Sequence, residues 1–247
     1  MTPDRCPTAA RSVVRDGLTL RAADYGGTVV LSPIGRLDLS TYAVLRDGLI
    51  GHLAEQPTAA VVVLGPDFEL GSDPMAATFG LVRERCRTWP RVPLAVVATV
   101  EPHRRMLRRT DLRRFVPCFD SVAEALAARA PEREWAAVRL SGDDLPYRAG
   151  DFTRRTCTAW GGLHEATPRA VLLAVELTGV ARAFGEPSPS LRIERFPDQL
   201  TISVRHTPAT PPTPEPLPTR VHRLGTACGR TPLPGGDEVV WAVIVLA

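Results

Sequence analysis

The sequence predicts a protein of two domains, in which an α/β domain precedes an α+β sandwich. Over residues 18–131, short apolar runs alternate with amphipathic helical patterns, which is typical of strands and helices that share one layered core. Over residues 132–247, two helical patterns are followed by strands of alternating polarity, which is typical of helices packed on an antiparallel sheet. A chain of 247 residues has the length of two ordinary domains.

The composition excludes several chemistries. All 30 basic residues are arginines, so no lysine is available as a nucleophile or as the cation of a phosphate-binding loop. The net charge of +3 is too small to predict a nucleic-acid partner. The five cysteines and five histidines are scattered without the spacing of metal ligands, so we expect no metal site.

The cysteines and the apolar runs also predict the compartment. An odd number of cysteines favours reduced thiols. Residues 1–16 lack the apolar core of an export signal, and no apolar run is long enough to cross a membrane. We therefore expect a cytoplasmic protein with no membrane partner.

The first domain is expected to follow a flexible N-terminus, residues 1–17, where prolines interrupt a mixed polar sequence. Two strands, over residues 18–24 and 28–34, flank a Gly-Gly turn and predict a hairpin. Leucines at helical spacing then predict a helix over residues 41–54.

The next stretch holds the candidate binding residues of the first domain. An unbroken apolar run over residues 60–64 predicts a buried strand, and a helical pattern begins at Met75. The acidic loop between them contains Asp67, Ser72 and Asp73. Backbone N–H groups without partners in a first helical turn favour negative charge, so these residues lie where either a helix cap or a phosphate is stabilised. The sequence leaves both alternatives open.

An arginine-rich helix follows the third buried strand. Most of its basic cluster, which begins with His103, is expected to face solvent, either as an ordinary solvated surface or as a docking patch for an acidic partner. The apolar residues Met106, Leu107, Leu112 and Phe115 are expected to face the core. The other elements predicted for this part are strands over residues 93–98 and 115–119 and a helix over residues 121–130.

The second domain is predicted from helical and alternating patterns in turn. A buried helix over residues 164–184 has few purely polar faces. A proline-studded segment over residues 207–219 has no periodic pattern and is expected to be an extended loop. The other expected elements are strands over residues 135–140, 191–196, 200–205 and 238–246, a helix ending at Trp160 and a short helix over residues 220–228.

The first domain resembles the STAS family, the fold of anti-sigma factor antagonists. The residues that carry the resemblance are Gly35-Arg36-Leu37-Asp38-Leu39, the apolar strand over residues 60–64 and the closing segment over residues 115–126. In that family a serine at the following helix N-terminus accepts a phosphate from a partner kinase. The resemblance places Ser72 at that position as a possible phosphosite, and Asp73 beside it supplies a permanent negative charge.

The second domain resembles the ATP-binding fold of anti-sigma factor serine kinases and histidine kinases. The resemblance rests on the order of parts: a strand, a helix ending at Trp160, a buried helix carrying Glu176-Leu177, a hairpin ending at Arg205, a proline-rich loop, and a final strand after Gly235-Gly236. It implies that Glu176 is the position of a catalytic base.

Three nucleotide-binding elements of that family are altered in this sequence. The magnesium-binding asparagine is absent from the segment containing Glu176 and Gly179, and His206 follows the hairpin where an adenine-reading aspartate is expected. Prolines within residues 215–220 replace a glycine-rich phosphate loop, and a proline has no N–H to donate. We therefore interpret Glu176, Gly179 and His206 as a degenerate nucleotide site.

The sequence thus predicts a non-enzymatic regulatory protein of a sigma-factor partner-switching system, with an anti-sigma factor or a sigma factor as partner and no cofactor. The alternative is an ATP-dependent serine kinase that uses Glu176 and magnesium with divergent ligands. A third hypothesis is that Arg205 and His206 hold another anion in the old cleft.

Overall fold

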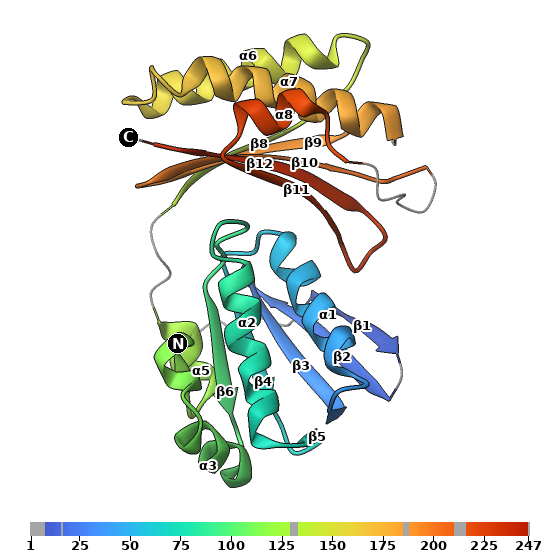
Figure 1. Cartoon of the computed structure of the whole chain (residues 1–247), viewed down its shortest axis with the longest axis vertical. Coiled ribbons are helices and arrows are strands. Elements are labelled where there is room, and N and C mark those ends of the chain that lie inside the picture. The colour runs from blue at the N-terminus through green and yellow to red at the C-terminus, as the bar shows by residue number, and fades with distance from the viewer. Residues whose placement is uncertain (1–7, 16, 129–132, 185–187, 210–215, 247) are drawn as a thin grey trace. The chain divides into compact units, whose positions relative to one another are not determined.

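The computed structural model describes residues 8–15, 17–128, 133–184, 188–209 and 216–246. The chain divides into two compact units, Met1–Pro131 and Glu132–Ala247, each built around its own sheet (Figure 1). The structure therefore confirms a mixed α/β architecture with two sheets. Each unit is described separately below.

Unit 1 contains a sheet with the strand order β1-β2-β3-β4-β6-β7, in which β5 also pairs with β3. The first three strands are antiparallel neighbours, whereas β3, β4, β6 and β7 are parallel. Parallel strands are covered on both faces, which is why β4 and β6 are continuous apolar runs in the sequence. The strands are β1 (Thr8–Arg15), β2 (Leu18–Tyr25), β3 (Thr28–Leu37), β4 (Ala59–Leu64), β5 (Phe68–Leu70), β6 (Leu94–Ala98) and β7 (Cys118–Phe119).

Helices cover both faces of this sheet. The leucines of α1 and the residues Phe79 and Val82 of α2 pack with one set of strand side chains, while Ala125 of α5 packs with the other set. Spacing of apolar residues by three or four positions places them on the buried side of each helix. The helices are α1 (Tyr42–Ala54), the 3₁₀ turn η1 (Asp73–Ala76), α2 (Ala77–Arg85), α3 (Glu101–Arg109), α4 (Leu112–Phe115) and α5 (Val122–Ala127).

The prediction of a flexible N-terminus over residues 1–17 is wrong for residues 8–15. These residues form β1 and pair antiparallel with β2 along its length. Pairing with an existing hairpin orders them through backbone hydrogen bonds, which the mixed polar sequence does not reveal. The rest of that prediction, residues 1–7 and residue 16, lies outside the described residues.

Unit 2 contains an antiparallel sheet with the strand order β11-β12-β10-β9-β8. Three helices lie on one face of it, and their apolar residues form a single core with alternate residues of the strands. The strands are β8 (Glu134–Arg139), β9 (Ser190–Phe196), β10 (Gln199–His206), β11 (Ala227–Pro232) and β12 (Glu238–Val245), and the helices are α6 (Leu145–Trp160), α7 (Thr167–Phe184) and α8 (Thr219–Leu224).

The expected short helix over residues 220–228 ends earlier and is followed by a strand. Helix α8 stops at Leu224, and residues 227–232 form the edge strand β11 against β12. Gly229 of β11 leaves room for the indole of Trp241, because a Cβ atom on this residue would lie 2.7 Å from the ring. The glycine thus lets the ring lie across the edge strand. The sequence of β11 has low intrinsic strand propensity, which is why the strand was not expected.

Candidate functional site

The segment that joins β4 to α2 in unit 1 is ordered by pairing with β3. Its three residues of β5 lie parallel to the end of that strand, with Gly35 opposite Phe68 and Leu37 opposite Leu70. The Gly35 N–H donates to the Asp67 carbonyl at 2.8 Å, and the Gly71 N–H donates to the Leu37 carbonyl at 2.8 Å. Part of the predicted acidic loop therefore forms the extra strand β5, and a backbone hydrogen bond to β3 holds the chain at each end of it.

Residues at the end of β3 and directly after it support this segment from the side. The Arg36 guanidinium pairs with Glu69 of β5 and lies 3.6 Å from the Asp38 carboxylate. Hydrogen bonds from the Ser40 hydroxyl and backbone N–H, and the nearby charge of Arg36, hold the pKa of Asp38 below its ordinary value. The Thr41 hydroxyl donates to the Arg36 carbonyl at 2.7 Å instead of capping α1.

The structure places the three predicted binding residues at the two ends of β5. Asp67 precedes this strand, and Ser72 and Asp73 follow it, all with exposed side chains. Ser72 has the position of the cap residue before η1, but its side chain makes no cap hydrogen bond. The cap alternative is therefore wrong for the Ser72 hydroxyl, which stays open to contact.

An apolar hollow begins beside Asp73. It has a volume of about 400 Å³, lies between η1, α2 and α4, and exposes far more apolar than polar surface. Leu81 is 55% exposed and Phe115 is 56% exposed at its sides, while Leu112 is buried. We define the apolar edge of unit 1 as Asp73, Leu81, Leu112 and Phe115. Exposed apolar residues gathered around a hollow are typical of an interaction surface.

The sequence failed to identify Phe115 as part of this surface. We expected it to face the core at the end of one continuous arginine-rich helix, but Thr110 has an extended backbone, and α4 starts as a separate short turn. Phe115 consequently points outward, although Met106, Leu107 and Leu112 are buried as predicted. Leu81 was also missed. The pair Leu81-Val82 is the signal, because Val82 is buried and its neighbour on a helix must face elsewhere.

His103 belongs to the basic cluster but lies on the buried side of α3, where it is 7% exposed. Its Nδ1 atom is 3.3 Å from the Leu64 carbonyl, and its ring lies 5.7 Å from that of Phe68. His103 thus connects α3 to the start of the segment described above. The arginines are partly engaged within the same helix, since Arg105 and Arg108 both pair with Glu101.

In unit 2, helix α8 packs on α7. Leu217 and Val221 are buried in the common core. Arg169 of α7 donates two hydrogen bonds to the Leu224 carbonyl, at 3.1 Å from Nε and 2.7 Å from Nη2. Arg220 of α8 lies 3.0 Å from Glu176, the predicted position of a catalytic base. Glu176 is thus part of an ion pair that joins the two helices.

His206 lies at the end of β10, on the face of the sheet that packs against the helices. It pairs in register with Glu238 of β12, and its Nε2 atom lies 3.3 Å from that carboxylate. Arg230 of β11 lies 3.1 Å from the same carboxylate, and all three side chains are largely buried. Burial raises the pKa of Glu238, but the close approach of His206 and the charge of Arg230 outweigh it, so the pKa lies below its ordinary value.

Gly179, the third residue of the predicted degenerate nucleotide site, and Arg205, which the anion hypothesis joins to His206, have different surroundings. Gly179 is exposed on α7, and a Cβ atom there would meet open space. Arg205 pairs with Asp237 at 2.7 Å, and the Thr207 hydroxyl donates to the same carboxylate. The hypothesis that Arg205 and His206 hold an anion together is not favoured, because each side chain already faces a carboxylate, Asp237 for Arg205 and Glu238 for His206.

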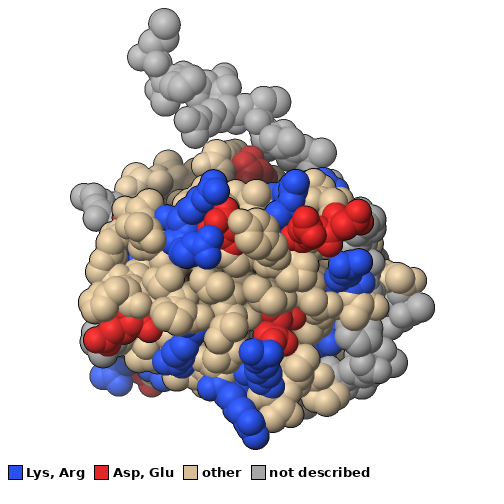
Figure 2. Space-filling view, turned by 90° about the horizontal axis from the view of Figure 1, so that it is seen from above, with Lys and Arg blue, Asp and Glu red and all other residues tan. Residues whose placement is uncertain are grey.

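Over the part of the chain that the structure describes, charges of both signs are mixed and no metal-ligand group is present. On the face drawn in Figure 2, Arg residues are interspersed with Asp and Glu. Within the ranges given above, no three His, Cys, Asp or Glu side chains are grouped as a metal site. No helix there combines the length and the apolar character that a membrane crossing requires.

Comparison with known proteins finds similar chains among the solved structures. No family model and no curated protein matches the sequence. The chain is similar to the crystal structure of an anti-sigma factor antagonist from Mycobacterium paratuberculosis, with 27% sequence identity, coverage of 46% of this chain and 94% of that chain, and a TM-score of 0.38. A TM-score of this size does not establish a shared fold or function.

Proposed function

We propose that the chain is a non-enzymatic regulator of sigma-factor partner switching, which binds an anti-sigma factor through the apolar edge of unit 1. In this proposal unit 2 is a pseudo-kinase domain that no longer uses magnesium and ATP. The observation that carries the proposal is the exposed hollow beside Ser72 and Asp73.

The geometry of unit 1 supports a binding role in two ways. Leu81 and Phe115 expose apolar surface that the fold itself does not bury. Asp73 carries an exposed carboxylate at the rim of the same hollow, which favours a partner that presents an apolar side chain next to a cation. A phosphate on Ser72 would add nearly two negative charges at this rim and would weaken binding of any acidic or apolar partner surface.

The contacts of unit 2 support the loss of nucleotide binding. Glu176 is engaged in an ion pair with Arg220 of α8, so its carboxylate already has a partner within the unit. Leu217 and Val221 fill the space between α8 and the core, and His206 is committed to Glu238. The residues present at these positions do not fit magnesium–ATP, which requires oxygen ligands for the metal and free N–H donors for the phosphates.

The proposal is tested by calorimetric titration of the full chain with each purified anti-sigma factor of the native cell. We expect one of them to bind, and we expect Leu81→Asp and Phe115→Asp each to weaken that binding at least about tenfold. Tyr147→Asp is the matched control, because Tyr147 is also an exposed aromatic residue but belongs to unit 2. Equal effects of all three variants, or no binding partner, would count against the proposal.

The alternative of an active serine kinase has its own test. Incubation with labelled ATP, magnesium and an anti-sigma factor antagonist should produce no labelled protein if unit 2 is a pseudo-kinase. Transfer of label that disappears in Glu176→Ala would establish the kinase instead. Because Arg220 is the partner of Glu176, Arg220→Ala should also be compared, since it frees the carboxylate without removing it.

A further inference from the structure

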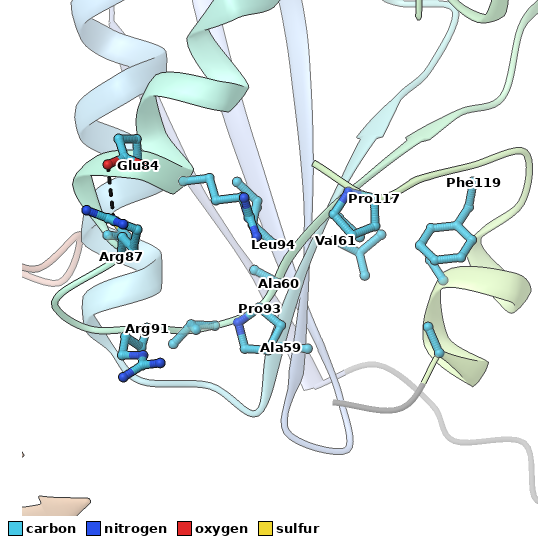
Figure 3. Close-up of a pocket in the computed structure, with 16 residues that line it drawn as sticks. Ala59, Ala60, Val61, Glu84, Arg87, Arg91, Pro93, Leu94, Pro117 and Phe119 are labelled. Atoms are coloured by element: carbon cyan, nitrogen blue, oxygen red, sulfur yellow. Dashed lines mark ion pairs between the residues drawn. The ribbon is translucent and has the colours of Figure 1, made fainter. Parts of the chain in front are cut away.

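A second cavity in unit 1 lies where the edge of the sheet is incomplete. Strand β7 has only two residues, and it pairs with Val96 and Val97 of β6. The first residues of β6, Leu94 and Ala95, therefore have no neighbouring strand on that side. Helix α5 has only six residues and leaves the same region uncovered. The result is a cavity of about 440 Å³, within the size range of small-molecule sites (Figure 3).

The larger part of the lining of this cavity is apolar. Val61, Leu94, Pro117 and Phe119 contribute to it together with several alanines. Cys86 also lines it, and burial raises the pKa of this thiol to about 12, so no thiolate is present there at neutral pH. This apolar part of the lining therefore favours the apolar part of a ligand, and Cys86 adds no negative charge to it.

The mouth of the cavity is basic. Its charged residues are three arginines and one glutamate: Arg83, Arg87, Arg91 and Glu84. Glu84 pairs with Arg87 at 3.1 Å, whereas Arg83 has no ion pair or hydrogen bond among the described residues. Figure 3 shows Glu84, Arg87 and Arg91 on one side of the cavity and Pro117 and Phe119 on the other. An apolar region and a cationic region thus lie at opposite sides of one space.

The backbone at Arg91 supports a site with a defined shape. Its φ angle is 56°, in the left-handed region that arginine rarely adopts, and its N–H donates to the Cys86 carbonyl at 3.0 Å. Strained conformations of this kind persist where the surrounding structure determines them, and they are common at ligand sites.

We propose that this cavity binds a small amphiphilic anion, whose apolar body packs against Val61, Pro117 and Phe119 and whose anionic group pairs with Arg83. The ligand class follows from the arrangement of apolar and cationic residues, and a carboxylate, a sulfonate or a phosphate monoester has the required chemistry. This inference concerns a surface different from the apolar edge of unit 1, so it is independent of the proposed partner.

The test uses the fluorescence of 1-anilinonaphthalene-8-sulfonate, an aromatic sulfonate, titrated into the full chain. We expect one saturable site, displacement by dodecyl phosphate, and no comparable displacement by the uncharged dodecanol. Arg83→Gln should weaken binding about tenfold, the effect of losing one charge-assisted contact. Arg85→Gln is the matched control, because Arg85 is exposed on the same helix but does not line the cavity.

A filling variant tests the apolar part of the site. Ala95→Phe places a ring in the cavity and should abolish saturable binding in a chain that still unfolds cooperatively. Leu81→Asp should leave the binding unchanged, which separates this site from the apolar edge of unit 1. Equal weakening by Arg83→Gln and Arg85→Gln, or equal displacement by dodecanol, would overturn the proposal even if Ala95→Phe does not fold.

Discussion

The candidate polar residues of the two units differ in whether they have partners within the unit. In unit 1, Ser72 and Asp73 lie exposed beside an open apolar hollow. In unit 2, Glu176 and His206 are each paired with a charged partner, and apolar side chains from α8 fill the adjoining space. The difference indicates that the polar residues of unit 1 are available for another molecule, whereas those of unit 2 stabilise the unit itself.

This comparison assigns different consequences to substitutions at the two places. A change at a satisfied and buried charge should alter the free energy of unfolding, because it leaves a partner unpaired in a low-dielectric environment. A change at an exposed residue without a partner should alter binding with little effect on unfolding. The predictions below test this distinction.

The largest expected effect is that of Glu238→Ala. The substitution leaves His206 and Arg230 buried without their common carboxylate, which should lower the free energy of unfolding of unit 2 by about 3–5 kcal/mol. Urea denaturation followed by tryptophan fluorescence measures it, since Trp135, Trp160 and Trp241 belong to unit 2. A loss below about 1 kcal/mol would show that the pairing in unit 2 contributes little.

The same carboxylate predicts an acid dependence. The pKa of Glu238 in the folded chain lies below its ordinary value of 4.5, so its stabilising contribution is complete above that pH and is lost as the pH falls through the folded value. Unit 2 of the wild type should therefore lose stability in acid. Urea midpoints measured across the acid range should depend less steeply on pH in Glu238→Gln, and identical slopes would contradict the assignment.

Gly35→Ala is expected to have the next largest effect on the free energy of unfolding. Gly35 has a φ angle of 105°, and an added Cβ would lie 2.2 Å from the backbone oxygen of Gly17. The substitution should lower the free energy of unfolding by about 3 kcal/mol, because neither backbone segment can move without disturbing the hydrogen bonds between β2 and β3. Hydrogen exchange of the amides in these two strands measures the loss. Gly65→Ala is the control, since a Cβ there meets open space. Equal losses of stability in Gly35→Ala and Gly65→Ala would contradict this explanation.

Val221→Ala tests how well α8 fills unit 2. Val221 is fully buried, so removing two methyl groups should cost about 2 kcal/mol in the urea denaturation of unit 2. Val245→Ala is a matched change at a residue that is 58% exposed, and it should cost less than about 0.5 kcal/mol. If the two losses were equal, the close packing of α8 would not be a source of stability.

The smallest effects on unfolding are expected for Ser72→Ala and Asp73→Ala. Neither side chain makes a hydrogen bond among the described residues, so each change should stay within about 0.5 kcal/mol of the wild type. Asp73→Ala should nevertheless weaken binding of the anti-sigma factor in the titration proposed above. A large loss of stability in either variant would show that this end of unit 1 is structural.

Much of the fold was predictable because its strands and helices are long and periodic. The hairpin of β2 and β3, the buried strands β4 and β6, and the long helix α7 all lie close to the ranges expected from their apolar patterns. The strands β1, β5 and β11 were not predicted. Their sequences are weakly apolar, and they form by pairing with neighbouring strands, which a local pattern does not encode.

The candidate site was only partly predictable for a related reason. Asp67, Ser72 and Asp73 were identified because a strand delivers them to a helix N-terminus. The apolar hollow beside them depends on a break at Thr110 that turns Phe115 outward. Pairings between distant segments, such as Arg220 with Glu176, are likewise set by tertiary packing and not by spacing in the chain.

The contact of Arg169 with the end of α8 has a consequence for motion. Two hydrogen bonds hold the last carbonyl of this short helix, and Val221 is buried beneath it. Local opening of α8 alone would expose that valine and leave a guanidinium without its acceptor. The backbone amides of α8 should therefore exchange with solvent only when α7 and the sheet open as well, so that α8 belongs to the same cooperative folding unit as the rest of unit 2 and is not a separately moving lid.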